Sequence, residues 1–470
     1  MQPKQCIAII ESIKAYAKQN PTEVQVYEDW FQAVVNLRDA LPQDKRFDAY
    51  KYSGELRFVC ATMMGKMKTG EDVAKVYDII GRTYLFEAKD VFDSYCIYLE
   101  WNRAPEKKFY QPRRKVLKTV ANALQDLADD RLDLLAISMP PGCGKTALAI
   151  FYLTWLAGRN PDEPMLTGSH SNSFVRGVYD ECLRIFDKDG EYLWNDVFPD
   201  VTVSNTNAKD CRIDLGKRKR FETLEFTSIG TGNAGLYRAS TLLYCDDLVS
   251  GIEVALSKPR LDKLWETYTT DLRQRKIGNK CKELHIATRW SVHDVIGRLE
   301  QNYGDSDRNR FIVMPAMDER DESNFDYDYG VGYSTETLRK QREVMDEMSW
   351  KALYMNQPVE REGLLFPADE LRYFNGVLPD GEPDRKLMVM DIAWGGGDFT
   401  ACPIAYVYGD AVFIPDLVFN NGDKTVTRPE VVGKIIQHKI NVVRGEANNG
   451  GDEYCDVVDS QLRQQGYHCS

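Results

Sequence analysis

The chain has 470 residues, enough for two or three domains, and its composition is that of an ordinary globular protein. Lys and Arg number 60 against 72 Asp and Glu, so the net charge of −12 excludes nonspecific coating of nucleic acid by the whole surface. Without a signal segment or an apolar run of roughly 20 residues, the chain is expected in the cytosol. Its cysteines and histidines show no zinc-site or disulfide spacing.

Residues 1–102 are predicted to form a helical N-terminal domain. Helical patterns cover residues 6–18 and 28–40, and breaks follow at Pro21, Pro42 and Gly70. No catalytic set of residues occurs in this part. We interpret it as a packing or protein-docking module.

Residues 103–324 alternate short apolar strands with helices, which predicts an α/β domain with a mostly parallel sheet covered on both faces. The expected core strands are 134–138, 165–169, 241–245 and 284–288. A hairpin is expected from residues 212–215 and 221–228, with a basic turn between them. The carboxyl ends of parallel strands form the usual site of such sheets.

The segment at residues 139–146, MPPGCGKT, lies between a predicted strand and a predicted helix, the setting of a phosphate-binding loop. The expected nucleotide-binding residues are Pro141, Gly142, Cys143, Gly144, Lys145 and Thr146. Lys145 would reach the terminal phosphates of ATP, and the Thr146 hydroxyl would hold Mg²⁺. Met139 and two prolines stand where the usual pattern begins with Gly.

Three further groups complete a predicted ATPase site. Asp246 and Asp247 follow an apolar strand as a Walker B pair, in which Asp246 would bind Mg²⁺ and Asp247 would orient or deprotonate the attacking water. Thr288 ends another strand and could sense the terminal phosphate. Phe109 and Gln111 could stack on and hydrogen-bond to adenine, although such a segment is more often structural.

The rest of the chain is predicted to contain two parts. Residues 325–379 form a lid or linker subdomain with a helix at 336–356, and residues 380–470 form a second α/β domain. Its expected strands are 387–391, 400–408, 411–419 and 442–446, and its expected helix is 429–438. Basic clusters at 113–115 and 217–220 are candidate DNA contacts, but solvated loops are the more usual interpretation.

Together these residues resemble the large terminase subunit of tailed bacteriophages, an ATP-driven DNA-packaging motor. The resemblance runs from Arg103 to the end of the chain. It is carried by segments 103–105, 109–114, 139–146, 230–232, 235–238, 288–294, 350–358 and 363–366, together with the Walker B pair. It implies a P-loop ATPase fold followed by a ribonuclease H-like nuclease domain, and it gives Thr288 and Arg289 a role in coupling hydrolysis to DNA movement.

Two departures from the family pattern concern the ATPase. Many relatives have Glu where this chain has Asp247, and some carry an arginine in the phosphate loop that is missing here. Arg184 or Arg238 could supply that positive charge to the transition state, from the same or a neighbouring subunit, although each is by default a surface arginine.

The resemblance also predicts a nuclease site that uses Mg²⁺ or Mn²⁺. Asp391 and Glu446 end two strands of the second α/β domain and could together hold metal, with Asp398 a third acid or a turn cap. Relatives normally have another acid on a later helix. Since the sequence stops at Ser470, we expect a C-terminally truncated domain with an incomplete metal site.

The sequence thus favours an ATP-driven viral DNA-packaging motor with a metal-dependent endonuclease. Its implied partners are double-stranded DNA, the portal of the procapsid and the small terminase subunit, and its implied location is the host bacterial cytoplasm. The resemblance also implies a homo-oligomeric ring on the capsid. Two alternatives stay open: a helicase-like nucleic-acid translocase, and an ATP-binding assembly protein with an inactive nuclease fold.

Overall fold

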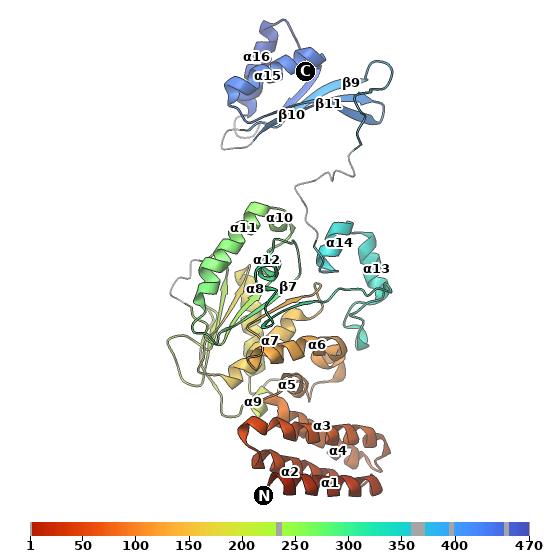
Figure 1. Ribbon diagram of the computed structural model, residues 1–470, viewed down its shortest axis with the longest axis vertical. Coiled ribbons are helices and arrows are strands. Elements are labelled where there is room, and N and C mark those ends of the chain that lie inside the picture. The colour runs from red at the N-terminus through yellow and green to blue at the C-terminus, as the bar shows by residue number, and fades with distance from the viewer. Residues whose placement is uncertain (1, 232–236, 359–371, 394–398, 446–450, 470) are drawn as a thin grey trace. The chain divides into compact units, whose positions relative to one another are not determined.

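The computed structural model describes residues 2–231, 237–358, 372–393, 399–445 and 451–469 (Figure 1). The chain divides into two compact units, Met1–Glu362 and Gly363–Ser470. Within the described residues, no helix is both long and apolar enough to cross a membrane.

The first unit begins with helices that pack around a core of their own. This core includes Trp30, Val34, Leu56 and Ile79, which are almost completely buried. Thr69 caps α4 because its hydroxyl accepts a hydrogen bond from the Asp72 N–H at 3.1 Å. The helices are α1 (Pro3–Gln19), α2 (Val24–Ala40), α3 (Phe47–Met63), α4 (Gly70–Ala88) and α5 (Phe92–Leu99), with short 3₁₀ turns at Gln43–Lys45, Met64–Lys66 and Pro105–Lys107.

The same unit contains an eight-stranded sheet in the order β3-β4-β5-β2-β6-β7-β1-β8. Strands β5, β2, β6, β7, β1 and β8 run parallel, and β3 and β4 form an antiparallel edge. The strands are β1 (Leu134–Ser138), β2 (Met165–Ser169), β3 (Val203–Asn207), β4 (Arg212–Leu215), β5 (Leu224–Ser228), β6 (Leu242–Asp246), β7 (Lys282–Ala287) and β8 (Asn309–Val313).

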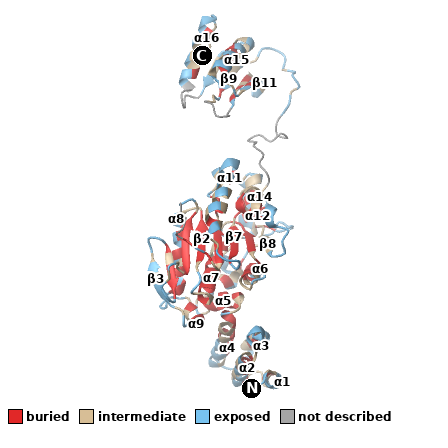
Figure 2. Ribbon diagram, turned by 60° about the vertical axis from the view of Figure 1, so that its left-hand side comes forward, coloured by how far each residue is buried: buried red, intermediate tan, exposed pale blue. Residues whose placement is uncertain are grey.

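Helices cover both faces of this sheet, so its central strands are buried (Figure 2). Alternate residues of β1 face opposite sides: Leu135 and Ile137 belong to one core, Leu134 and Ala136 to the other. The covering helices are α6 (Tyr110–Ala128), α7 (Lys145–Arg159), α8 (Asn172–Phe186), α9 (Trp194–Val197), α10 (Ile252–Ala255), α11 (Lys258–Thr267), which continues through a π turn at Tyr268–Leu272 and a 3₁₀ turn at Arg273–Arg275, and α12 (Val295–Tyr303).

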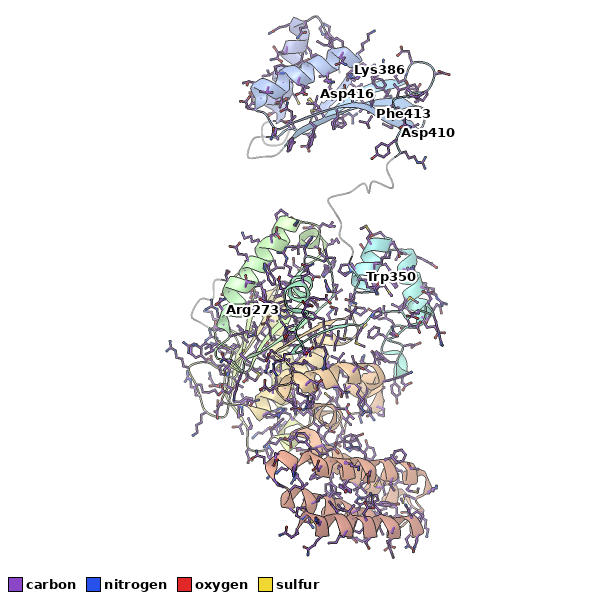
Figure 3. The ribbon with its side chains drawn as sticks, in the orientation of Figure 1. Arg273, Trp350, Lys386, Asp410, Phe413 and Asp416 are labelled. Carbon is purple, nitrogen blue, oxygen red and sulfur yellow. The ribbon has the colours of Figure 1, made fainter. Side chains whose placement is uncertain are left out.

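A small subdomain ends the first unit. It contains a 3₁₀ turn at Asp328–Gly330 and the helices α13 (Thr335–Glu343) and α14 (Glu347–Leu353), and we call it the lid. The single helix expected at 336–356 is wrong: a second helix starts after Asp346, whose carboxylate accepts the Ser349 N–H at 2.8 Å. Trp350 is buried with Ala316, Met317 and Leu338 (Figure 3).

The second unit is a four-stranded sheet packed with two helices. The order is β11-β10-β9-β12, with β10 antiparallel to β9 and β11, and β12 parallel to β9. The elements are β9 (Arg385–Met390), β10 (Thr400–Tyr408), β11 (Ala411–Asn420), α15 (Lys424–His438), β12 (Val442–Gly445) and α16 (Gly451–Gln464). The predicted fold class is confirmed: helices, a mostly parallel sheet and a second α/β unit follow one another.

Candidate nucleotide site

The carboxyl ends of four neighbouring strands meet at one edge of the large sheet. In the register of the sheet, Ser169 pairs with Asp246, Asp246 with Ile286, and Ser138 with Ala287. The segments that follow β1, β2, β6 and β7 therefore leave the sheet side by side. This edge is where the sequence placed the candidate site.

The phosphate-binding loop joins β1 to α7 at this edge. Gly142 and Gly144 have φ angles of +74° and +91°, a conformation that favours glycine. A side chain on Gly142 would meet the Tyr333 hydroxyl at 2.5 Å, and one on Gly144 would meet the Phe109 ring at 2.6 Å. Helix α7 starts at Lys145, so its first turn presents N–H groups that lack intrahelical partners, together with the positive end of the helix dipole.

Lys145 connects the loop to the next two strands of the site. Its Nζ donates a hydrogen bond to the Thr288 hydroxyl at 2.6 Å and lies 3.3 Å from Oδ2 of Asp247. Lys145 and Thr288 are both buried. The structure therefore brings together Lys145, Asp247 and Thr288, which come from three separate parts of the chain.

Asp246 is the carboxylate best suited to a metal ion. It is fully buried, and one of its oxygens accepts a hydrogen bond from the Tyr244 hydroxyl, whereas Oδ1 has no hydrogen-bond partner among the described residues. Burial, and then the charge of Asp247, raise the pKa of Asp246 to about 7, while the Tyr244 hydrogen bond, the Lys145 charge and the Thr146 hydroxyl oppose the increase. A buried carboxylate oxygen beside a threonine hydroxyl fits the ligand chemistry of Mg²⁺.

Asp247 is held by its backbone as well as its side chain. Its φ angle is +40°, unusual for a residue other than glycine, and its N–H donates to the Ile286 carbonyl at 3.0 Å. Its Oδ1 accepts the Thr288 N–H at 2.8 Å, and its carbonyl oxygen lies 2.7 Å from Nδ1 of His170. This geometry fixes the carboxylate beside the ammonium group of Lys145.

Thr288 and Arg289 connect the site with the lid. The Arg289 side chain is buried and donates to Asp294 at 2.9 Å, and Asp294 also caps α12. The Arg289 N–H donates to Oδ1 of Asn356 at 3.1 Å, and Asn356 Nδ2 is 3.4 Å from the Met314 carbonyl. A short backbone path therefore runs from the Lys145 contact to the end of the lid.

Four residues of this site were not predicted from the sequence: Tyr244, His170, Tyr333 and Asn356. Tyr244 and His170 lie within or directly after strands that were predicted, so their proximity to the Walker B pair could have been noticed. Tyr333 and Asn356 belong to the lid, and only the fold brings them to the phosphate loop and to Arg289.

Other predicted residues lie around or away from this site. Phe109 packs on the loop at Gly144, and its ring is 5.4 Å from that of Phe151 in an edge-on contact. Gln111 is exposed at the start of α6, with Oε1 3.3 Å from Nζ of Lys108. Its contact with adenine stays a prediction.

Neither candidate arginine lies beside the phosphate loop of its own chain. Arg184 lies twelve residues after the start of α8, about 18 Å along the helix, and its exposed side chain pairs with Glu181 at 3.2 Å. Arg238 precedes β6, at the opposite edge of the sheet, and its guanidinium stacks 4.5 Å from the Phe221 ring. Action of either arginine on a neighbouring subunit stays a prediction.

The two basic clusters are partly used inside the protein. Arg113 donates to the carbonyls of Phe109 and Val331, each at 2.8 Å, and Arg114 forms a two-bond ion pair with Asp93. Lys219 ties the β4–β5 turn through the Asp214 carboxylate at 2.6 Å. These three side chains act as internal ties, which leaves fewer of the clusters' charges for DNA.

In the second unit only part of the predicted nuclease site is described. Asp391 directly follows β9 and is exposed, and its N–H and carbonyl pair with Ala401 at 3.0 and 2.9 Å. Strands β9 and β12 are parallel and end at the paired residues Met390 and Gly445. Asp398 and Glu446 lie outside the described residues. Among the residues that are described, no group of three or more Asp, Glu, His or Cys side chains is arranged to hold a metal.

No family model and no curated protein sequence matches the chain. Among solved structures, it is similar to the large terminase of a thermophilic bacteriophage in complex with ADP, at 13% identity and a TM-score of 0.34, over 77% of this chain and 82% of that one. The same terminase in complex with ATP-gamma-S is 13% identical with a TM-score of 0.34, over 77% of this chain and 81% of that one. The large terminase of bacteriophage HK97 is 13% identical with a TM-score of 0.35, over 75% of this chain and 78% of that one. These three solved structures are all of phage large terminases.

Proposed function

We propose that this protein is an ATP-hydrolysing motor that packages viral DNA. The observation that carries the proposal is the gathering of Lys145, Asp246, Asp247 and Thr288 at one sheet edge, directly beside a phosphate-binding loop. Each side chain would have a distinct task in phosphoryl transfer: Lys145 and Thr288 would contact the phosphates, Asp246 would hold the metal, and Asp247 would activate the water. The motor function is inferred from the terminase-like motifs around that site.

Hydrolysis would begin when the terminal phosphate of ATP draws Lys145 away from Asp247 and Thr288. The released Asp247 carboxylate then orients a water molecule and accepts its proton as the water oxygen bonds to the γ-phosphorus. The bond from that phosphorus to the bridging oxygen breaks, giving ADP and phosphate. Thr146 and Asp246 would hold Mg²⁺, which supplies charge stabilisation for the phosphates.

Thr288, Arg289 and Asn356 give hydrolysis a route to movement. When Lys145 leaves Thr288, the Asp247 contact with the Thr288 N–H is free to change, and the adjacent Arg289 N–H bonds directly to Asn356. The lid would follow this change, since Tyr354 in the lid stacks on Trp350 at 4.7 Å. DNA held by the protein would move with each cycle, and copies assembled as a ring on the portal of a procapsid would act in turn.

The second unit is proposed to be the endonuclease that cuts DNA before and after packaging. Support comes from the parallel strands β9 and β12, whose ends are followed directly by Asp391 and Glu446. Two carboxylates in neighbouring strand-end positions suit Mg²⁺ or Mn²⁺ and phosphodiester hydrolysis. Loss of Mn²⁺-dependent plasmid cutting in both Asp391→Ala and Glu446→Ala tests this role, and cutting that survives in both variants contradicts it.

The test of the motor function is DNA-stimulated ATP turnover, measured with and without procapsids and with the small terminase subunit added. The parent should hydrolyse ATP faster with double-stranded DNA, and Lys145→Ala and Asp247→Asn should be inactive. A helicase-like translocase would separate strands in an unwinding assay, which a packaging motor would not. Unchanged turnover in both variants would instead support the assembly protein that binds ATP only as a structural ligand.

A further inference from the structure

A pocket is lined by Leu248, the residue that directly follows the Walker B pair. It has a volume of about 290 Å³ and lies between the segment that follows β2, the segment that follows β5, and α11. Its walls are apolar at Leu248, Val254 and Leu264, and its polar lining includes Ser250 and Thr267. No residue of the phosphate loop lines it, so a molecule bound there would be a second ligand of the ATPase unit.

Two cations line this pocket. Arg260 and Lys263 lie one turn apart on α11, and both are exposed. Neither forms an ion pair with any described residue, and no carboxylate lines the pocket. Other arginines nearby are already paired: Arg298 with Asp262, and Arg273, at the far end of the same helical segment, with Glu283 (Figure 3). Arg260 and Lys263 thus keep their charges available at the pocket.

His170 connects the pocket with the catalytic carboxylate. It lines the pocket directly after β2, and its Nδ1 lies 2.7 Å from the Asp247 carbonyl oxygen. A carbonyl only accepts hydrogen bonds, so Nδ1 must carry the proton. This bond holds the backbone of Asp247, whose φ angle of +40° already departs from the ordinary range. A ligand that shifts His170 therefore shifts the residue proposed to activate water.

We propose that this pocket binds a phosphate of the DNA backbone and signals its presence to Asp247 through His170. The inference rests on the proposed function, which it extends with a DNA contact and a route of stimulation. Arg260 and Lys263 would bind the phosphate, and His170 is a positioning residue. A backbone phosphate suits two unpaired cations next to two hydroxyls, and the nucleotide phosphates already have the loop at 139–146.

The binding arm of the test compares the full chain with Arg260→Ala/Lys263→Ala. The matched control is Lys188→Ala/Lys209→Ala, which also removes two exposed lysine or arginine charges without ion pairs among the described residues. Affinity for a DNA duplex is measured at several salt concentrations. Since each phosphate contact contributes about 0.9 to the slope of log affinity against log salt, the pocket variant, which loses one phosphate contact, should lose about 0.9 from this slope. The control should lose less than about half of that amount.

The signalling arm measures ATP turnover with and without the duplex. Arg260→Ala/Lys263→Ala should keep the DNA-free rate and lose most of the stimulation. His170→Ala should bind DNA like the parent and yet lose stimulation. His170→Asn should regain it, because its amide nitrogen lies close to the position of Nδ1 and can donate to the same carbonyl.

Each outcome decides a separate point. If the parent is stimulated and the pocket variant is stimulated equally with an unchanged salt slope, the DNA site is wrong while the packaging function stands. If His170→Asn behaves like His170→Ala, the route through the Asp247 carbonyl is wrong. If DNA does not stimulate the parent at all, the inference and the proposed motor are both contradicted.

Discussion

Removing the charge of Asp246 should stabilise the metal-free protein at alkaline pH. In the folded state burial and the neighbouring Asp247 raise the pKa of Asp246 from 3.8 to about 7, whereas the unfolded chain ionises near the ordinary value. The folded state therefore keeps a proton that the unfolded state has lost, and the free energy of unfolding falls as pH rises from about 4 to about 7. The asparagine in Asp246→Asn cannot titrate, so the free energy of unfolding of this variant does not fall in this way.

The size of the effect follows from the two pKa values. The full difference, at about 1.4 kcal/mol per tenfold change in proton affinity, is about 4 kcal/mol above pH 7. The buried amide nitrogen that Asp246→Asn introduces would lack a partner, at a cost of about 1–3 kcal/mol that does not depend on pH. The change of stability with pH therefore reports on Asp246 alone, because the cost of the new amide is the same at every pH. The stability of the variant relative to the parent should increase by about 3 kcal/mol between about pH 5 and about pH 8.

Urea unfolding with EDTA present measures this, with tryptophan fluorescence from the buried Trp155 and Trp194 as the signal. Asp305→Asn is the matched control, because Asp305 is exposed, and its stability relative to the parent should stay constant across the same pH range. A pH-independent difference for Asp246→Asn would refute the reasoning. So would a relative stability that decreases toward alkaline pH.

Three more predictions concern the lid, the loop and the second unit. Asn356→Ala should lower the ATP turnover number more than it weakens nucleotide binding, because it removes the hydrogen bonds to Arg289 and Met314. Steady-state kinetics measure the turnover number and a fluorescent-nucleotide titration measures the affinity. Equal losses in both would contradict the coupling role. Gly142→Ala should weaken nucleotide binding in the same titration, because its Cβ would meet Tyr333 at a positive φ angle; unchanged affinity would count against the loop geometry. Lys434 and His438 lower the pKa of Asp416 to about 2, so Asp416→Asn should lower the free energy of unfolding of the second unit by up to about 1 kcal/mol at neutral pH. This difference from the parent should disappear as pH falls toward about 2. Hydrogen exchange of α15 measures it, and a difference that persists at acid pH would exclude the ion pairs as its cause.

Much of the large sheet could be predicted because its strands are apolar and end in distinctive residues. The strands expected at 134–138 and 165–169 have those bounds in the structure, and those expected at 241–245 and 284–288 are displaced by one or two residues. Strands β3 and β8 were not predicted. Both lie at edges of the sheet and are half exposed, so their sequences lack a continuous apolar run.

The site could be predicted as far as its residues follow strands. Lys145, Asp246, Asp247 and Thr288 each have a position in the sequence that a parallel sheet converts into proximity. The lid contacts could not be predicted in this way. The left-handed backbone of Asn356 and the approach of Tyr333 to Gly142 depend on how α13 and α14 pack, and side-chain periodicity carries no information about that packing.

The positions of the two candidate arginines could not be predicted from the sequence either. Arg184 and Arg238 were predicted as possible sources of the positive charge that the phosphate loop lacks. The structure places both away from the carboxyl edge of their own subunit, because α8 carries Arg184 along its length and Arg238 precedes β6. A charge pattern identifies candidate catalytic arginines, whereas the path of the helix or loop that carries each arginine decides whether it can reach the phosphate.

We propose that one triphosphate binds among Lys145, Thr146, Asp246 and Thr288. A crystal structure with a non-hydrolysable ATP analogue and Mg²⁺ tests it most directly. We expect phosphates against the N–H groups of residues 142–146, Lys145 moved from Asp247 to the terminal phosphate, and the metal beside Thr146 and Asp246. A nucleotide bound elsewhere, or bound with Lys145 still on Thr288 and Asp247, would contradict it.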